Sequence, residues 1–301
     1  MTIAAALAAA IASGCGLGAG RGTSDVSLTV TRDFGTRPVL SVTQQRVTGS
    51  ETVMRMLQRS SRVTTRYGGG FVESVNGLSG TSNRRDWFYY VNGVEASVGA
   101  AQTAVHRGDR IWWDLHDWSA TESIPAVVGS FPEPFVHGVG GKRLPTTLEC
   151  ASDVKPACDR VAAALRAVGV PTASQVLGTG SGTDSLAVLV GTWGDIQRSF
   201  AAALIERGPS SSGIYANFAG PRGSSLQLLD HHGHVARTLA AGSGLIAASA
   251  QNSQPTWLIT GTDPTGVAAA ATSLTPASLE HRFALAVHGP ARLPLPLNGA
   301  S

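Results

Sequence analysis

Residues 85–93 read Arg85-Asp86-Trp87-Phe88-Tyr89-Tyr90-Val91-Asn92-Gly93, and this stretch decides the fold of the first part of the chain. A run of aromatic residues favours a β-strand, and Asn-Gly is the dipeptide that best suits a type I′ hairpin turn. A second aromatic run follows, Gly108-Asp109-Arg110-Ile111-Trp112-Trp113-Asp114-Leu115-His116. Four of the six tryptophans lie between residues 87 and 118, so the large aromatic side chains are concentrated in two predicted strands.

Alternate side chains of a strand point to opposite faces of a sheet. Trp87, Tyr89 and Val91 therefore share one face of the first strand, while Phe88 and Tyr90 share the other. One face must fill the core of a small domain, and the opposite face of a sheet covered on one side should be solvated. Large rings on a solvated face form an apolar patch, which usually marks a ligand or a partner.

We therefore predict a ligand-binding surface built from rings of both strands: Trp87, Tyr89, Tyr90, Trp112 and Trp113. The alternative is that these rings are core residues, or that the outer face is buried against a second domain. Asp114 and His116 also lie on the second strand, and we expect both to be solvated rather than bound to a metal. The Asn92-Gly93 pair is explained by turn geometry.

The residues around the aromatic runs predict an α+β domain over residues 25–118. Val26–Thr31 alternates apolar and polar residues as a half-buried strand does. Ser50 suits the N-cap of a short helix that begins at Glu51. Short strands are predicted over 63–67 and 71–75, on either side of a triglycine. One helix crossing a mixed sheet in fewer than 100 residues indicates a β-grasp-like fold.

Four motifs in order carry a resemblance to a known family: E-T-V-M-R-M-L (51–57), Y-G-G-G-F-V-E-S-V-N-G (67–77), W-F-Y-Y-V-N-G (87–93) and R-G-D-R-I-W-W (107–113). The segment resembles the domain of unknown function 4430, also called the transcobalamin C-terminal-like domain. The resemblance implies a β-grasp-like ligand-binding module, often carried by exported bacterial proteins. It makes cobalamin or another planar cofactor the expected ligand. In transcobalamin a large helical barrel completes the site, and residues 119–301 show no pattern of such a barrel.

The N-terminus predicts export. Residues 1–14 contain a short apolar run that ends in Ala12-Ser13-Gly14 before Cys15, which resembles the lipobox of bacterial lipoproteins. Cys15 is the predicted lipidation site, and residues 15–24 form a Gly-rich tether. The run is too short to cross a bilayer as a helix and lacks a basic residue before it. A cleaved secretory peptide and an ordinary N-terminal helix are the alternatives.

The remaining cysteines, Cys150 and Cys158, form an even pair in an exported protein, and we predict a disulfide between them. Two buried free thiols are the alternative. Residues 119–145 are rich in Pro and Gly and predict an extended linker. Residues 293–301 are predicted to be a disordered tail.

Residues 146–292 predict an α/β domain: a mixed sheet with helices on one side. Gly178–Gly182 is Gly-rich but precedes a strand, so it does not match a nucleotide-binding loop. Asp230-His231-His232-Gly233-His234 is rich in metal-ligand types, yet its flanks predict a hairpin with solvated imidazoles. No Ser–His–Asp or Cys–His set can be assembled. We therefore expect no enzymatic activity, no metal site and no resident cofactor.

Composition narrows the function further. The net charge is only +3 despite a pI of 9.0, and no dense basic cluster is present, which argues against nucleic-acid binding. The chain is therefore expected to be an exported binding protein, anchored by lipid on the outer face of the cytoplasmic membrane, that carries a small molecule to a membrane transporter. The alternative is a structural or adhesion protein at the cell surface.

Overall fold

The two aromatic runs form neighbouring strands, β6 (Arg85–Val91) and β8 (Arg110–Asp117). They belong to a computed structural model that describes residues 25–44, 46–80, 84–252 and 254–297. Tyr89 lies opposite Trp113 and Tyr90 lies opposite Trp112 across the antiparallel pair. The predicted alternation of faces is confirmed.

The first sheet has the strand order β2-β1-β8-β6-β7. The remaining strands of this sheet are β1 (Val26–Arg32), β2 (Arg37–Gln44) and β7 (Val94–Glu95). β1 runs antiparallel to β2 and parallel to β8, so the sheet is mixed. Asn92 and Gly93 have φ values of 53° and 78°, as the predicted two-residue hairpin between β6 and β7 requires.

Helix α1 (Val53–Ser60) packs on one face of this sheet. Its buried side chains, Met56 and Leu57 among them, share a core with β1, β6 and β8. The N-cap is Thr52, whose side chain accepts a hydrogen bond from the Arg55 amide, and not the predicted Ser50. The chain stays extended to Thr52 because Thr52 forms a β-bridge with Ala104.

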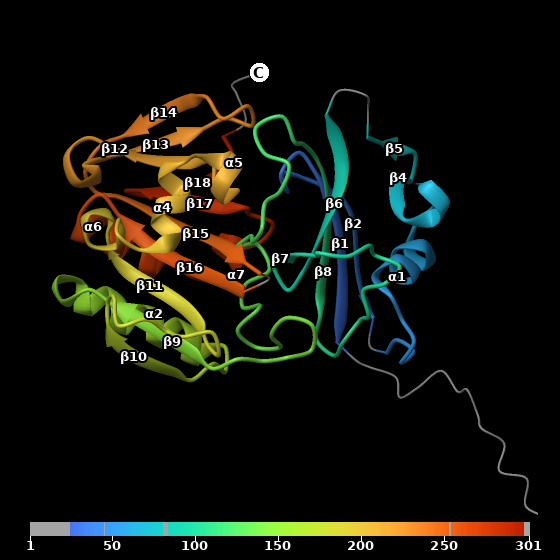
Figure 1. Cartoon of the computed structure of the whole chain (residues 1–301), viewed down its shortest axis with the longest axis horizontal. Coiled ribbons are helices and arrows are strands. Elements are labelled where there is room, and N and C mark those ends of the chain that lie inside the picture. Colours follow the sequence, from blue (N-terminus) through green and yellow to red (C-terminus); the bar gives the residue numbers. More distant parts are fainter. Residues whose placement is uncertain (1–24, 45, 81–83, 253, 298–301) are drawn as a thin grey trace, which may run out of the picture.

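A small second sheet lies beside α1, on the side of the first sheet that faces away from the C-terminal half (Figure 1). It consists of β3 (Val63–Arg66), β4 (Phe71–Val75) and β5 (Leu78–Ser79), with the 3-10 turn η1 (Tyr67–Gly69) between the first two.

The C-terminal half is built on a seven-stranded mixed sheet of order β10-β9-β11-β16-β15-β17-β18. Its strands are β9 (Thr146–Cys150), β10 (Thr172–Val176), β11 (Leu186–Thr192), β15 (Ser243–Gln251), β16 (Gln254–Gly261), β17 (Ala284–His288) and β18 (Ala291–Leu295). A three-stranded sheet packs with it, formed by β12 (Ala216–Ala219), β13 (Ser225–Leu229) and β14 (Val235–Leu239). The helical elements are η2 (Ser152–Val154), α2 (Lys155–Ala167), α3 (Trp193–Ile196), α4 (Phe200–Glu206), α5 (Pro209–Ser212), η3 (Pro221–Gly223), α6 (Pro264–Thr272) and α7 (Pro276–Leu279).

Both faces of the seven-stranded sheet are covered. Val188 and Ile259 point to the face that packs against α2 and α6. Leu189 and Leu258 point to the opposite face, against α3, α4 and the three-stranded sheet. The prediction of helices on one side only is wrong, because the central strands are apolar on both faces and each face needs a cover.

The fold class is α+β, with an N-terminal sheet domain followed by a C-terminal mixed-sheet domain, as predicted. The β-grasp assignment stays a prediction. The predicted tail from residue 293 is wrong for its first residues, because β18 pairs with β17 through Leu295 and the Leu297 amide donates to the Leu229 carbonyl. Residues 298–301 lie outside the described residues.

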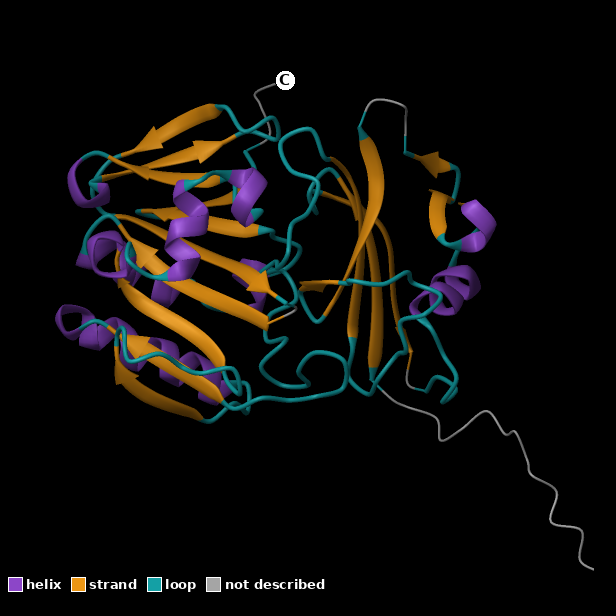
Figure 2. Cartoon of the chain, viewed as in Figure 1, coloured by secondary structure: helices purple, strands orange, loops and turns teal. Residues whose placement is uncertain are grey.

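The segment between Asp117 and Thr146 carries no helix and no named strand, and Figure 2 shows it as loop between the two halves. Two adjacent residues of this segment form hydrogen bonds with different halves of the protein. The Val127 amide donates to the Gly93 carbonyl, and the Val128 amide donates to the Phe283 carbonyl. Phe131 and Phe135 are buried against Trp257 of the C-terminal half. The predicted linker is therefore a packed layer and not an extended connector.

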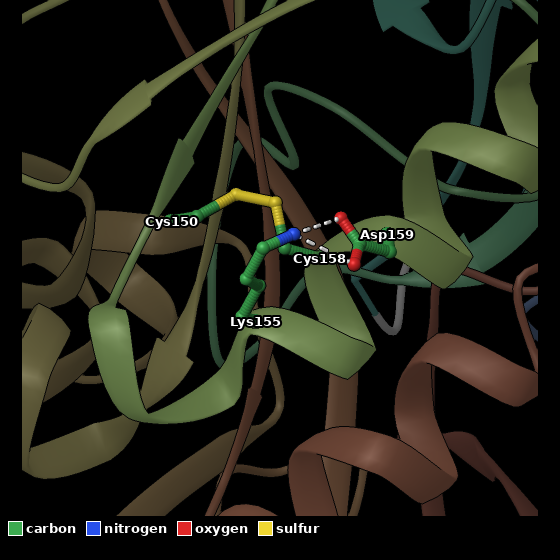
Figure 3. Close-up of a disulfide and its surroundings, with 4 residues drawn as sticks. All are labelled: Cys150, Lys155, Cys158 and Asp159. Carbon is green, nitrogen blue, oxygen red and sulfur yellow. Dashed lines mark hydrogen bonds and ion pairs between the residues drawn. A yellow bond between two sulfur atoms is a disulfide. The ribbon is translucent and has the colours of Figure 1, made fainter.

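Cys150, at the end of β9, forms a disulfide with Cys158 on α2, which confirms the predicted bridge (Figure 3). Lys155 and Asp159 form an exposed ion pair next to it. Cys15 and residues 1–24 lie outside the described residues. Among the helices of the described chain, none has the length and apolar character needed to span a membrane.

Candidate functional site

The five predicted site residues divide between the two faces of the first sheet. Trp87, Tyr89 and Trp113 lie on the inner face, with α1, and Trp87 and Trp113 are buried. Tyr90 and Trp112 lie on the outer face and are 0% and 3% exposed.

The outer face is covered by the C-terminal half. Phe283 packs edge-on against Tyr90 and Trp112, with ring centroids 5.7 and 5.1 Å away. Phe34 and Tyr215 complete this aromatic interface at 5.4 Å. The expected solvated patch of outer rings is therefore wrong. Burial of apolar area stabilises the folded state by roughly 25 cal/mol per Å². The outer rings are buried by contact with the C-terminal half, which therefore stabilises the folded protein.

Asp114 and His116 are buried in the same interface, which corrects the expectation that they are solvated. The Asp114 carboxylate accepts hydrogen bonds from the backbone amides of Phe34 and Gly35, at 3.1 and 2.9 Å, and from the Thr31 hydroxyl. His116 Nδ1 lies 2.9 Å from the same carboxylate, and its ring is stacked on Phe34. The paired groups are satisfied within the protein and hold the interface together.

The inner-face rings line a cavity of about 250 Å³, which we call the aromatic cleft. It lies between β4, β6 and the segment Glu95–Ala100, and its walls include Phe71, Trp87, Tyr89, Val98 and Trp113. Tyr89 stacks on Trp113 with ring centroids 4.7 Å apart. Three of the five predicted site residues therefore meet at one cavity, Trp112 lines a different one, and Tyr90 lines neither.

The Tyr89 hydroxyl closes one side of the aromatic cleft. It donates to the Val98 carbonyl and lies 2.8 Å from the Thr103 hydroxyl. Burial raises the pKa of Tyr89, so the phenol is neutral at physiological pH and able to donate. The Tyr89 hydroxyl therefore helps to hold the segment that carries Val98 over the cleft.

The mouth of the cleft is apolar and exposed. Phe71 and Val98 are 52% and 50% exposed, and Tyr67, whose ring contacts Phe71 at 6.4 Å, is 85% exposed. These side chains form an exposed apolar rim around the cavity. Sequence reasoning did not select these three residues. The Tyr-Gly-Gly-Gly-Phe run was the available signal, since two aromatics flanking three glycines have no obvious core role.

Glu95 is the charged residue on the wall of the aromatic cleft. Burial raises its pKa, and the Ser123 hydroxyl donates to its carboxylate. Residues 95–98 also line a neighbouring cavity of about 320 Å³ with Val91, His106 and Val139. The Glu95–Val98 segment therefore separates two cavities.

The histidine-rich turn forms the predicted hairpin between β13 and β14. His232 Nδ1 lies 3.1 Å from the Ser119 hydroxyl, and the imidazole of His231 contacts that of His232. Within residues 25–44, 46–80, 84–252 and 254–297, no three metal-ligating side chains converge to hold an ion.

Comparison with curated protein sequences returned no match. Among solved structures, a crystal structure from Ruminococcus gnavus, described as that of a proposed metal-binding protein, aligns with 31% of this chain and 97% of its own at 20% identity and a TM-score of 0.26. All residues that line the aromatic cleft lie within residues 50–117, the segment matched by a family model. That match agrees with the resemblance carried by the four sequence motifs. Residues 50–117 of this chain match the family model of the Domain of unknown function (DUF4430).

Proposed function

We propose that this protein is a binding protein, not an enzyme, and that the aromatic cleft holds a small, planar, largely apolar ligand. The observation that carries the proposal is the meeting of Trp87, Tyr89 and Trp113 at a cavity whose mouth is formed by exposed Phe71 and Val98. Flat rings stack on indole and phenol faces at little entropic cost.

The size of the cleft sets the size of the ligand. Small-molecule sites commonly enclose about 300–1,000 Å³, and the aromatic cleft, at about 250 Å³, holds a single ring system of one or two fused rings. Cobalamin, the expectation from the family resemblance, is much larger. It would enter only after residues 95–98 move and join the cleft to its neighbour.

The cellular context belongs to the same proposal. A disulfide supports an oxidising compartment, and Cys15 supplies the lipid anchor on the outer face of the cytoplasmic membrane. In this place the protein would pass its ligand to a membrane transporter. Expression in a bacterial host with labelled fatty acid tests the anchor: the wild type takes up label and sediments with membranes, and Cys15→Ala does neither.

Ligand binding is tested with two probes, the planar dye 8-anilinonaphthalene-1-sulfonate and cyanocobalamin. Val98→Arg places a long charged side chain across the mouth of the cleft. Val235→Arg is the matched control, because Val235 is 52% exposed on β14 in the other half. We expect saturable dye fluorescence in the wild type and in Val235→Arg, and its loss in Val98→Arg.

Equal dye binding in all three proteins, or none in the wild type, would count against a site in the aromatic cleft. Cyanocobalamin decides the identity of the ligand. Quenching of tryptophan fluorescence in the wild type, abolished by Val98→Arg, would identify a corrinoid that opens the Glu95–Val98 segment.

A structural or adhesion role is the second proposal, favoured by the exposed pair Tyr67 and Phe71 at the cleft mouth. A protein partner would cover these rings. The adhesion role predicts that Tyr67→Ser abolishes attachment to a cell-wall fraction and changes the affinity for the dye by no more than about twofold.

A further inference from the structure

A second cavity lies on the outer face of the first sheet, where the two halves of the protein do not meet tightly. It has a volume of about 340 Å³, and we call it the interdomain cleft. One wall is made by β1, β2 and β8, and the opposite wall by Gly129, Ser130, Glu280 and His281. Clefts between domains are common places for small-molecule sites.

The strand wall is a grid of hydroxyl groups. Ser27 of β1 is paired with Thr43 of β2, and Thr29 of β1 is paired with Ser41 of β2. Cross-strand neighbours on one face lie about 4.5–5.5 Å apart. Four hydroxyls therefore stand at regular spacing on the wall, and each one can both donate and accept a hydrogen bond.

The same register continues onto β8. Ser27 is paired with Arg110, and Thr29 is paired with Trp112, so a guanidinium and an indole extend the hydroxyl rows. Arg110 is positioned by its Nη1, which donates to the carbonyls of Ser130 and Phe131 at 3.5 and 3.0 Å. The guanidinium carries five N–H donors, and the described bonds use Nη1 alone.

The opposite wall contributes a carboxylate and an imidazole, from Glu280 and His281. Glu280 is exposed, and His281 Nε2 lies 4.0 Å from its carboxylate. His281 has φ of 56°, in the left-handed region that non-glycine residues seldom adopt, and its ring lies 6.0 Å from Trp112. Burial lowers the pKa of His281, so its imidazole is neutral at pH 7, with one donor and one acceptor.

We propose that the interdomain cleft binds a neutral, polyhydroxylated ligand, a short carbohydrate. Vicinal sugar hydroxyls need partners that both donate and accept, which the Ser27, Thr29, Ser41 and Thr43 hydroxyls provide. Trp112, which is 3% exposed, adds a small apolar area to the wall of the cleft. The proposal is independent of the function assigned to the aromatic cleft, whose lining has rings where this one has hydroxyls.

Charge selects a neutral ligand over an ionised one. The lining of the cleft carries both signs of charge, since Asp25 and Glu280 are carboxylates and Arg110 is a guanidinium. A phosphorylated or carboxylated sugar would meet the Glu280 carboxylate, and a polyamine would meet the Arg110 guanidinium. Like charges brought together disfavour both ligands.

The test is calorimetric titration of the full chain with maltose, cellobiose and N,N′-diacetylchitobiose. We expect one or more of them to bind with one site per chain. Thr29→Val and Ser41→Ala each remove one hydroxyl, and each should weaken binding about 3- to 10-fold, the effect of one hydrogen bond. Thr238→Val removes an exposed hydroxyl from β14 and should change nothing.

Amide chemical shifts show where on the protein the sugar binds. Sugar-induced shifts should map to residues 27–29 and 41–43 and persist in Val98→Arg, which blocks only the aromatic cleft. Absence of saturable binding by all three sugars at about 50 mM overturns the proposal. Equal weakening by Thr238→Val, or loss of binding in Val98→Arg, also overturns it.

Discussion

Single residues in this protein show how burial changes the behaviour of polar groups. Glu95 is half-buried on the wall of the aromatic cleft, and burial raises its pKa above the ordinary value of 4.5. The hydroxyls of Tyr90 and Tyr215 are buried and have no hydrogen-bond partner among the described residues. A buried polar group without a partner costs about 1–3 kcal/mol. Substitution of Glu95 or of either tyrosine should therefore change the free energy of unfolding.

The Glu95 carboxyl predicts a pH dependence. Because its folded pKa lies above its unfolded value, the folded state binds the proton more tightly, and stability from this group falls as pH rises through the folded pKa. Glu95→Gln imitates the protonated form. In urea unfolding from pH 4 to 8 the variant should be the more stable protein above the folded pKa, and the gain should vanish toward pH 4. Exposed Glu122→Gln is the control; a gain at pH 7 that equals the gain at pH 4 would contradict the mechanism.

Two phenol deletions should act in opposite directions. Tyr215→Phe removes a buried hydroxyl without a partner, so the free energy of unfolding should stay level or rise by about 1 kcal/mol. Tyr89→Phe removes the bonds to Val98 and Thr103 and should lower it by about 0.5–1.5 kcal/mol. Chemical unfolding of both variants checks the pair, and a Tyr215→Phe protein less stable than Tyr89→Phe would refute the assignment.

At the scale of elements, the described helices and strands follow local signals where those signals are strong. The sequence predicts a strand over Val235–Leu239 and a helix over Pro156–Val168; β14 has these bounds, and α2 begins and ends within one residue of the prediction. The sequence predicts one Ala-rich helix over Ile196–Glu206. The structure has two short helices, α3 and α4, because the Ser199 side chain accepts a hydrogen bond from the Ala202 amide and caps a new helix start. The sequence pattern does not predict β9, β10 or β18, because short strands at sheet edges or with mixed composition have weak periodicity.

The disulfide links two such elements and gives a prediction of its own. Cys150 and Cys158 are eight residues apart, and closing a loop of this length stabilises by about 2–3 kcal/mol. The double variant Cys150→Ser/Cys158→Ser should lose that amount in urea unfolding. Wild-type protein unfolded with excess dithiothreitol is the matched control and should lose a similar amount; an unchanged midpoint in both would show that the bridge does not limit stability.

At the scale of the whole molecule, the aromatic interface couples the two halves. Phe283 belongs to the C-terminal half, yet it contacts Phe34, Tyr90 and Trp112 of the N-terminal half. The connecting segment is bonded to both halves, so separation of the halves would expose it as well. This arrangement predicts that the protein unfolds as one unit while the interface is intact.

Phe283→Ala should uncouple the halves. Truncation of a buried Phe costs about 3–5 kcal/mol, and here much of that loss falls on the interface. Calorimetry should show two transitions in place of one, and limited proteolysis should cut within residues 119–145. Phe218→Ala is the control, because Phe218 stacks on Trp193 inside the C-terminal half at 4.3 Å. A single transition in both variants would argue against coupling through Phe283.

The sequence by itself determined what consecutive residues encode: the alternation of Trp87 to Val91, the Asn92-Gly93 hairpin, the family of residues 50–117, and the pairing of the two cysteines downstream of the predicted signal segment. Only the tertiary structure decided which face of the first sheet is covered. Tyr90 and Phe283 are far apart in the chain, and no local pattern tells a ring packed on a second domain from a ring left in water. The cleft beside Trp87, Tyr89 and Trp113 likewise arises where β4, β6 and residues 95–100 converge, since the shape of a cavity is a property of packed surfaces and not of any one strand.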